Sequence, residues 1–243
     1  MSRIRLGVNI DHIATLRNAR GGSHPDPLRA ARMIRAAGGD QVTAHLREDR
    51  RHITDADMER LVASADLPVN MEMAATAEML AIALRLRPHA CCIVPERREE
   101  RTTESGLDVL RGEASLCQMV PRLRAAGIRV SLFVDPDEEQ LRAAARVGAD
   151  AVELHTGTYA LARGAAREKE LERLRRGAAL VRELGLECHA GHGLDYDNVS
   201  AVAAIPEVVE LNIGHFLIGE AIFVGFTESV RRMRRLMDAA RGA

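Results

Sequence analysis

Short apolar stretches recur along the chain at intervals of about 30 residues, and several of them end in a polar cluster. Between them lie segments with apolar residues three and four positions apart, which is the spacing of one face of a helix. The strand-like stretches lie near residues 4–10, 40–46, 68–73, 89–94, 129–134, 150–155, 186–190 and 208–213. Helical spacing is clearest at residues 27–37, 55–65, 75–86, 136–147 and 216–240. The sequence therefore predicts strands that alternate with helices.

Alternating strands and helices build βα units and a parallel sheet. An open doubly wound sheet is the alternative architecture. Eight units with polar residues at strand ends early, midway and late in the chain fit a closed ring better. No linker or low-complexity segment interrupts the pattern. We therefore expect an α/β fold with a single domain over residues 1–243, a (β/α)8 TIM barrel that allows for extra short helices.

The third strand-like stretch shows how the polar residues are placed. Successive side chains of a strand point to opposite faces, so Asn70 and Glu72 share one face and Met71 lies on the other. Barrel strands are normally buried on both faces, and an inward carboxylate or imidazole is costly unless it is paired or used. Glu72, His45 and Glu153 fall on the expected inward face. They predict a catalytic site at the carboxyl ends of the strands.

The charge balance argues against a nucleic-acid partner. The chain has 34 Lys and Arg against 35 Asp and Glu, a net charge of -1, and its arginines are interleaved with acidic residues. It therefore lacks a basic footprint for nucleic acid.

The apolar runs of the chain are well short of the ~18 residues of a membrane span, and its first residues lead into a strand rather than a signal segment. We expect a cytoplasmic protein without nucleic-acid or membrane partners.

Cofactor chemistry is bounded by motifs that the sequence lacks. No GxGxxG motif follows a strand, and no P-loop occurs. The single lysine, Lys169, lies in a charged helical stretch, so no strand end offers an amine for a Schiff base. Cys91, Cys92, Cys117 and Cys188 show no CxxC spacing, and we interpret them as buried small hydrophobic residues. We expect no cofactor and no metal.

Six sequence blocks resemble those of one known family. They are GVNIDHIATLR at 7–17, HLREDRRHI at 45–53, NMEMA at 70–74, ELHTG at 153–157, AGHGL at 190–194 and ELNIGH at 210–215. In this order, and over almost the whole chain, they resemble the pyridoxine 5'-phosphate synthase family. The resemblance implies a (β/α)8 enzyme that condenses 1-deoxy-D-xylulose 5-phosphate with 3-amino-2-oxopropyl phosphate to pyridoxine 5'-phosphate, phosphate and water. It also implies a homo-octamer.

Such a condensation needs groups that give and take protons near neutral pH, and His and Glu are suited to this. His45 and Glu72 lie on neighbouring strands, where burial would raise the pKa of Glu72 toward a useful value. A satisfied core histidine and a structural ion pair are the alternative. By resemblance, His192 in its Gly-His-Gly turn is the proton donor and Glu153 stabilises an intermediate. An inward carboxylate could also orient a histidine or pair with an arginine.

Two phosphorylated substrates require two anion sites, which arginine side chains or helix N-termini can supply. For the deoxyxylulose phosphate, the resemblance implies contacts from Asp11, His12, Arg47, His52 and Thr102. For the amino ketone phosphate, it implies contacts from Asn9, Arg20, Gly193, Gly214 and His215. Thr103 is an alternative to Thr102, and residues 47–52 would also suit a solvated charged loop. Residues 96–106 form a long charged loop, either a lid or merely solvated.

Two other functions are compatible with the sequence. A metal-dependent phosphosugar epimerase or hydrolase barrel would use ligands such as Asp11, His45 and His155 at strand ends. Against it, no His-x-His pair closes the first strand, and the arginines that follow His45 would repel a divalent cation. A non-catalytic barrel that binds phosphorylated metabolites would keep the arginines, but it has no reason to keep both His45 and Glu72 inward.

Overall fold

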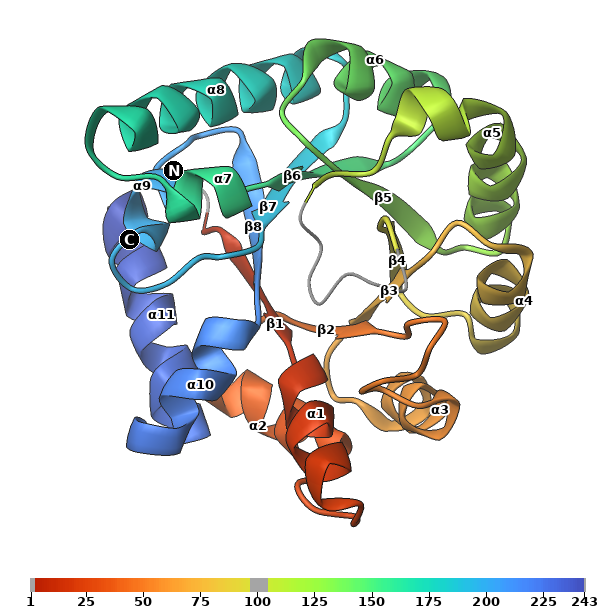
Figure 1. The fold of residues 1–243 in the computed structure, drawn as a ribbon, viewed down its shortest axis with the longest axis vertical. Helices are drawn as coiled ribbons and strands as arrows, with labels where there is room; N and C mark the ends of the chain where they lie inside the picture. The colour runs from red at the N-terminus through yellow and green to blue at the C-terminus, as the bar shows by residue number, and fades with distance from the viewer. Residues whose placement is uncertain (1–2, 97–104, 243) are drawn as a thin grey trace.

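The computed structural model describes residues 3–96 and 105–242, which contain a closed barrel of parallel strands (Figure 1). The strands follow one another around the ring in chain order, and β8 pairs with β1 to close it. Their bounds are β1 Arg5–Asn9, β2 Gln41–His45, β3 Val69–Met73, β4 Ala90–Ile93, β5 Arg129–Val134, β6 Ala151–His155, β7 Glu187–Gly191 and β8 Val208–Ile213. The predicted (β/α)8 barrel is confirmed, and each strand overlaps one of the strand-like stretches.

Helices surround the ring of strands (Figure 1). Their bounds are α1 Asp11–Arg20, α2 Pro27–Ala37, α3 Asp55–Ser64, α4 Ala77–Leu86, α5 Val109–Ala125, α6 Glu138–Arg146, α7 Gly157–Leu161, α8 Gly164–Glu183, α9 Val199–Ala203, α10 His215–Val224 and α11 Phe226–Arg241. Local signals explain two of the starts. Asp26 caps α2 by accepting from the Leu28 N–H, and Thr54 forms a capping box with Asp57 at α3. Both helices begin where their apolar spacing predicts.

The stretch at residues 216–240 forms two helices, so the prediction of one helix there was wrong. Helix α10 ends at Val224, and α11 begins at Phe226. Gly225 between them has a φ of 84°, a conformation that glycine adopts without steric cost. A residue in that conformation cannot continue an α-helix, so the chain starts a new helix at this point.

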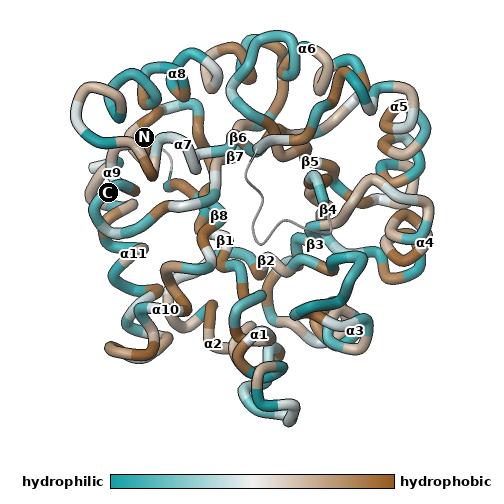
Figure 2. The backbone as a smooth tube through the Cα atoms, viewed as in Figure 1, coloured by the Kyte–Doolittle hydropathy of each residue, from teal (hydrophilic) through white to brown (hydrophobic). Residues whose placement is uncertain are grey.

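Apolar and polar side chains lie on opposite faces of the strands. Outward residues such as Val8 and Met71 are fully buried in a core that the strands share with the helices. Figure 2 shows hydrophobic residues recurring along the barrel strands and the surrounding helices. Inward residues include Glu153 and Asn212, which are 3% and 4% exposed. Because buried polar groups must be hydrogen-bonded, this interior requires a network of polar contacts.

The cysteines are free, and three of them are buried. Cys91, Cys92 and Cys188 lie in strands, as the sequence predicts for small hydrophobic residues. Cys117 is exposed on α5, so its predicted burial was wrong. Its helix packs on the barrel along one side only, and Cys117 lies on the other.

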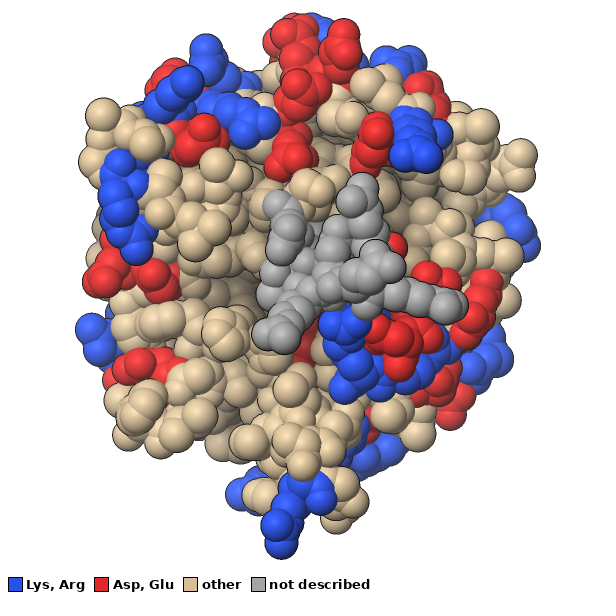
Figure 3. Space-filling view, in the orientation of Figure 1, with Lys and Arg blue, Asp and Glu red and all other residues tan. Residues whose placement is uncertain are grey.

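Charged residues of both signs are interleaved on the face of the molecule seen in Figure 3. Lys169 is exposed on α8, away from every strand end, which agrees with its expected surface position. Among the described residues, no helix combines the length and the apolar character needed to cross a membrane. The cytoplasmic location stays a prediction.

Candidate active site

His45, the last residue of β2, lies between two carboxylates at the carboxyl end of the barrel. Its Nε2 is 2.7 Å from Oε1 of Glu96, and its Nδ1 is 3.9 Å from Oε2 of Glu72. The backbone N–H of His45 donates to Oδ1 of Asp11 at 2.8 Å. A carboxylate beside each ring nitrogen lets the buried imidazole hold a proton on either side, which suits an acid-base group.

Glu72 on β3 lies directly opposite His45 in the sheet register. Burial raises the pKa of Glu72 well above its ordinary value, and the carboxylates of Asp11 and Glu153 raise it further. The Asn9 amide donates to Glu72 Oε2 at 3.3 Å and opposes this shift. A carboxyl group with a raised pKa can take up and return a proton near neutrality. The inward positions of His45 and Glu72 are confirmed, and their catalytic roles stay predictions.

Glu153 on β6 lies inside the barrel, where Asn212 holds it. Its Oε2 accepts from Nδ2 of Asn212 at 2.8 Å and is 3.9 Å from Sγ of Cys92. Burial raises the pKa of Glu153 to about 7, an effect that His189 opposes and Glu210 strengthens. The carboxyl group therefore changes its charge near neutral pH, which suits a residue that responds to charge on an intermediate.

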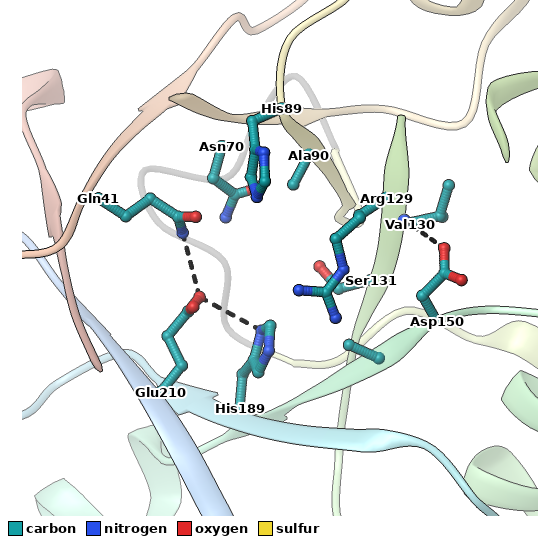
Figure 4. Close-up of a pocket in the computed structure, with 11 residues that line it drawn as sticks. Gln41, Asn70, His89, Ala90, Arg129, Val130, Ser131, Asp150, His189 and Glu210 are labelled. Carbon is teal, nitrogen blue, oxygen red and sulfur yellow. Dashed lines mark hydrogen bonds and ion pairs between the residues drawn. The ribbon is translucent and has the colours of Figure 1, made fainter. Parts of the chain in front are cut away.

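Polar groups continue toward the amino-terminal end of the barrel, where Figure 4 shows Gln41 and His189 on either side of Glu210. Glu210 Oε1 accepts from Gln41 at 3.1 Å and from Asn212 at 3.2 Å, and it is 3.3 Å from Nδ1 of His189. Gln41, His189 and Glu210 border a cavity of about 20 Å³, which has room for a single water molecule. Because Asn212 donates to both Glu210 and Glu153, it links this cavity to the site above it.

His192 follows β7 between two glycines. Its φ of 82° is rare for a residue with a side chain, and such conformations cluster at functional sites. Its ring centre is 5.2 Å from that of His155 and 6.4 Å from that of Phe133. Burial, together with the smaller effects of His155 and His215, lowers the pKa of His192 to about 4. His192 is therefore neutral at neutral pH. If it delivers a proton, another group must give it a new one.

The first and last strands bring Asn9, Asp11 and Gly214 together. The Asn9 amide donates to Oδ2 of Asp11 at 2.8 Å, and the Asp11 N–H donates back to Oδ1 of Asn9 at 3.0 Å. A Cβ atom on Gly214 would lie 2.7 Å from the Cβ of Asn9, so this approach requires glycine. Asp11 begins α1 and Gly214 precedes α10, so both helices start at the carboxyl end of the barrel.

His12 and His215 meet at these two helix starts. Their Nδ1 atoms are 3.1 Å apart, and their rings pack edge to face with centres 4.7 Å apart. Burial and the neighbouring His215 lower the pKa of His12, while Asp11 opposes them. In the described part of the chain, neither α1 nor α10 has a side-chain cap. The first backbone N–H groups of α10 can therefore donate to an anion, whereas the first N–H of α1, that of Asp11, already donates to Asn9.

Arg47 and His52 lie on the loop that follows β2. Both are buried, at 5% and 8% exposure. Arg47 donates from Nε to Oδ1 of Asp49 at 3.2 Å. Nδ1 of His52 accepts from the Ile53 N–H at 2.9 Å, so a neutral His52 carries its proton on Nε2. The burial of these two residues does not fit the alternative of a solvated loop.

Two predicted ligands are not placed at the site. One of them is Arg20, which is exposed at the far end of α1. Gly193, by contrast, directly follows His192 and has a φ of 75°. A ten-residue helix is about 15 Å long, and α1 runs outward from the barrel, so Arg20 lies at the end of α1 that is farther from the strands (Figure 1). The predicted contact of Arg20 with the amino ketone phosphate stays a prediction. Thr102 and its alternative Thr103 lie outside the described residues, as does most of the 96–106 loop.

One group of described residues could hold a metal ion. Asp11, His45 and His52 each offer a ligand atom, and these atoms lie within 4.8 Å of one another. Three protein ligands are typical of a catalytic zinc site. The metal-dependent alternative therefore has a physical basis. Activity of chelator-treated protein, with and without added metal, tests it.

Comparison with known proteins identifies the family. Residues 6–239 match the family model described as pyridoxal phosphate biosynthesis protein PdxJ. The chain belongs to this family. A relative from Rhodospirillum rubrum is 64% identical over 242 residues, which cover 99% of this chain and 97% of the relative. A relative from Xanthobacter autotrophicus is 62% identical over 244 residues, with 99% and 95% covered, and both are named pyridoxine 5'-phosphate synthase.

Solved structures outside the PdxJ family share the fold. An aldolase titled 4-hydroxy-2-oxoglutarate aldolase/2-deydro-3-deoxyphosphogluconate aldolase matches with a TM-score of 0.64 and 16% identity, covering 96% of this chain and 93% of that one. KGPDC from Streptococcus mutans matches with a TM-score of 0.67 and 12% identity, covering 98% and 99%. At these identities the likeness concerns the barrel alone.

Sequence reasoning missed two partners of the site residues in this PdxJ chain. Glu96 binds His45 and is 4% exposed at its side chain, although its loop was predicted to be a lid or solvated. Asn212 holds Glu153 from β8, although it was noted only as part of a motif. Glu96 follows shortly after β4, so the signal that marked the other candidates, a polar residue just beyond a strand, would have found it.

Gly191→Ala is expected to lower kcat about 10²-fold, because it displaces Glu153. A Cβ atom at this position would lie 2.4 Å from Oε1 of Glu153 and 2.8 Å from the backbone oxygen of Asn212. Steady-state kinetics and a thermal melt measure the effect. Gly219→Ala is the matched control, since nothing lies within 4 Å of its Cβ position. A Gly191→Ala variant with the wild-type kcat would show that the position of Glu153 does not limit turnover.

Proposed function

We propose that this PdxJ protein is a pyridoxine 5'-phosphate synthase that condenses 1-deoxy-D-xylulose 5-phosphate with 3-amino-2-oxopropyl phosphate. Family membership supports an enzyme of this pathway. The observation that carries the chemistry is the pair His45 and Glu72, which lie opposite each other on neighbouring strands with Nδ1 and Oε2 3.9 Å apart. Two adjacent groups that exchange protons suit the condensation of an amine with a ketone, in which the first adduct loses water to give an imine.

The residues divide the work by their environments. Glu72 takes protons next to a carbonyl, since burial raises its pKa, and His45 exchanges protons between Glu72 and Glu96. His192 delivers a proton to a leaving oxygen, and Glu153 balances positive charge on an imine intermediate. No lysine takes part: the only one, Lys169, is exposed on α8. The amino ketone brings its own amine.

The two phosphates are bound at the starts of α1 and α10 and by the loop after β2. Arg47 and His52, with Asp11 and His12, bind the deoxyxylulose phosphate, and the burial of Arg47 and His52 supports this role. Asn9, Gly193, Gly214 and His215 bind the amino ketone phosphate, for which the uncapped N–H groups of α10 are suited. Thr102 stays a predicted ligand of the first phosphate.

We also propose a homo-octamer, as the family resemblance implies. Ile222 and Phe223 at the end of α10 are 73% and 82% exposed, and Leu161 is 84% exposed. Large apolar side chains that are exposed next to each other, as Ile222 and Phe223 are, suit burial against a second copy. Arg20 on the outward end of α1 would then be free to serve the site of another copy. The mass in solution, against 26.6 kDa for one chain, tests the assembly.

The proposed activity predicts that chelator-treated protein converts the two substrates to pyridoxine 5'-phosphate without added metal. Product is followed by its absorbance, and released phosphate is measured in parallel. Activity that appears only after zinc or manganese is restored would favour the metal-dependent alternative at Asp11, His45 and His52. Tight binding of either substrate without any product would favour the non-catalytic barrel. Absence of both would overturn the proposed function.

A further inference from the structure

His155, the last residue of β6, has no role in the chemistry described above. Its ring is 5% exposed, and its Nδ1 is 3.0 Å from Oδ1 of Asp135. The other carboxylate oxygen of Asp135 accepts from the Gly106 N–H at 3.2 Å. Asp135 therefore has a fixed orientation and holds the Nδ1–H of His155, which leaves Nε2 as the nitrogen that exchanges protons.

Nε2 of His155 is buried, and among the described residues it has no hydrogen-bond partner. A buried polar nitrogen without a partner is rare and calls for an explanation. It lies beside His192: a Cβ atom on Gly157 would be 2.5 Å from Nε2 of His155 and 3.1 Å from Cδ2 of His192. The absence of a side chain at Gly157 is what lets the two rings approach.

The separation of the two rings suits direct proton transfer. Their centres are 5.2 Å apart, with the planes tilted by 56°. Two imidazoles joined by an N–H···N hydrogen bond of about 2.9 Å have centres roughly 5 Å apart. A rotation of the His192 ring therefore makes the bond without moving the backbone.

We propose that the pair of Asp135 and His155 stores the proton that His192 delivers to the substrate. His155 as the imidazolium gives its Nε2 proton to one nitrogen of His192, while His192 gives the proton on its other nitrogen to the leaving oxygen. His192 begins and ends neutral, in its two tautomers, and the oxygen leaves as water. A proton from hydronium or a buffer acid in the solvent later adds to the outer nitrogen of His192, and the inner proton returns to His155. This inference rests on the proposed function, since it requires a substrate oxygen that leaves.

The surrounding charges favour this direction of transfer. Asp135 faces His155 from the end of β5, and the hydrogen bond from His155 lowers the pKa of this carboxyl group, as does the more distant Arg173. His192 is faced by His155 and by His215 from α10, neither of which favours a cation on it. The carboxylate therefore stabilises positive charge on His155 rather than on His192.

Asp135→Asn tests the proposal with little risk to folding, because the Asp135 side chain is 35% exposed. We expect kcat to fall about 10–100-fold, the KM values to change less than about threefold, and the basic limb of the kcat–pH profile to move to lower pH. Loss of the carboxylate weakens the hold on the stored proton, so the rate declines at a lower pH. His155→Gln should lower kcat similarly and abolish that limb.

Asp137→Asn is the matched control, since Asp137 is exposed in the same loop and Asn also caps a helix well. It should leave kcat and its pH profile unchanged. An Asp135→Asn variant with the wild-type pH profile, or with a change in KM only, would overturn the proposed proton storage by Asp135 and His155. Product formation by the wild type would still uphold the proposed function. If the wild type forms no product, nitrogen-15 shifts of His155 still test the pairing. A neutral His155 without a proton on Nδ1 in the wild type would overturn it.

Discussion

Glu72→Gln is expected to lower kcat by about 10²–10⁴-fold while binding of 1-deoxy-D-xylulose 5-phosphate is retained. The carboxamide keeps the shape of the side chain and an oxygen that can accept from Asn9, which is 3.3 Å from Glu72 Oε2 in the wild type. It cannot take up a proton. Turnover is therefore lost and binding is not, which separates an enzyme from a metabolite-binding barrel.

The pH profile gives this prediction a second readout. A base works only when it is deprotonated, and burial raises the pKa of Glu72 well above its ordinary value. The wild-type rate should therefore fall as the pH drops through that raised pKa, and the variant should lack this limb. Calorimetry measures substrate binding, and Glu183→Gln, on the exposed end of α8, is the control. A Glu72→Gln variant that retains a third of the wild-type kcat would contradict the role.

The fold could be predicted because its signals are local. The strands show as short apolar runs, and the inward positions of Glu72 and Glu153 follow from alternation along each strand. The break at Gly225 was also visible as a glycine, but the apolar spacing on both sides outweighed it. A glycine within a helical pattern has several causes, and only the backbone conformation decides between them.

The contacts within the site were harder to predict because they join residues far apart in sequence. Glu96 and His45 are separated by 51 positions, and Asn212 and Glu153 by 59, so the pairing depends on the closure of the barrel. The polar residues at the strand ends identified the candidate site residues. They did not show which of these side chains contact each other. Arg20 lies at the outer end of α1, so its predicted contact with a phosphate stays a prediction.

The ion pair of Arg17 and Asp57 connects the site to the stability of the fold. Nη1 and Nη2 of Arg17 donate to the two oxygens of Asp57 at 2.6 and 2.7 Å, and the side chains are 11% and 5% exposed. Nη2 also donates to the backbone oxygen of His52 at 3.3 Å. The pair thus joins α1 to the start of α3 and holds the loop that carries His52.

Asp57→Asn is expected to destabilise the protein by about 3–5 kcal/mol, because it leaves the buried cation of Arg17 without its partner. Burial disfavours the Asp57 carboxylate, but hydrogen bonds from Arg17 and Thr54 outweigh this and lower its pKa. A lowered pKa contributes stability above the unfolded value of about 3.9, and that contribution is lost as the pH falls through the folded value.

Urea unfolding at pH 7 and at pH 3 measures this difference, which should shrink at the lower pH. Asp55→Asn is the control on the same turn, since Asp55 is 46% exposed in its pair with Arg50 and should cost at most about 1 kcal/mol. Because Arg17 also holds the His52 backbone, Asp57→Asn should raise the KM for the deoxyxylulose phosphate more than it lowers kcat. Equal stability of the two variants would mean that solvent reaches the Arg17 cation, and an unchanged KM would mean that the His52 loop keeps its shape without the pair.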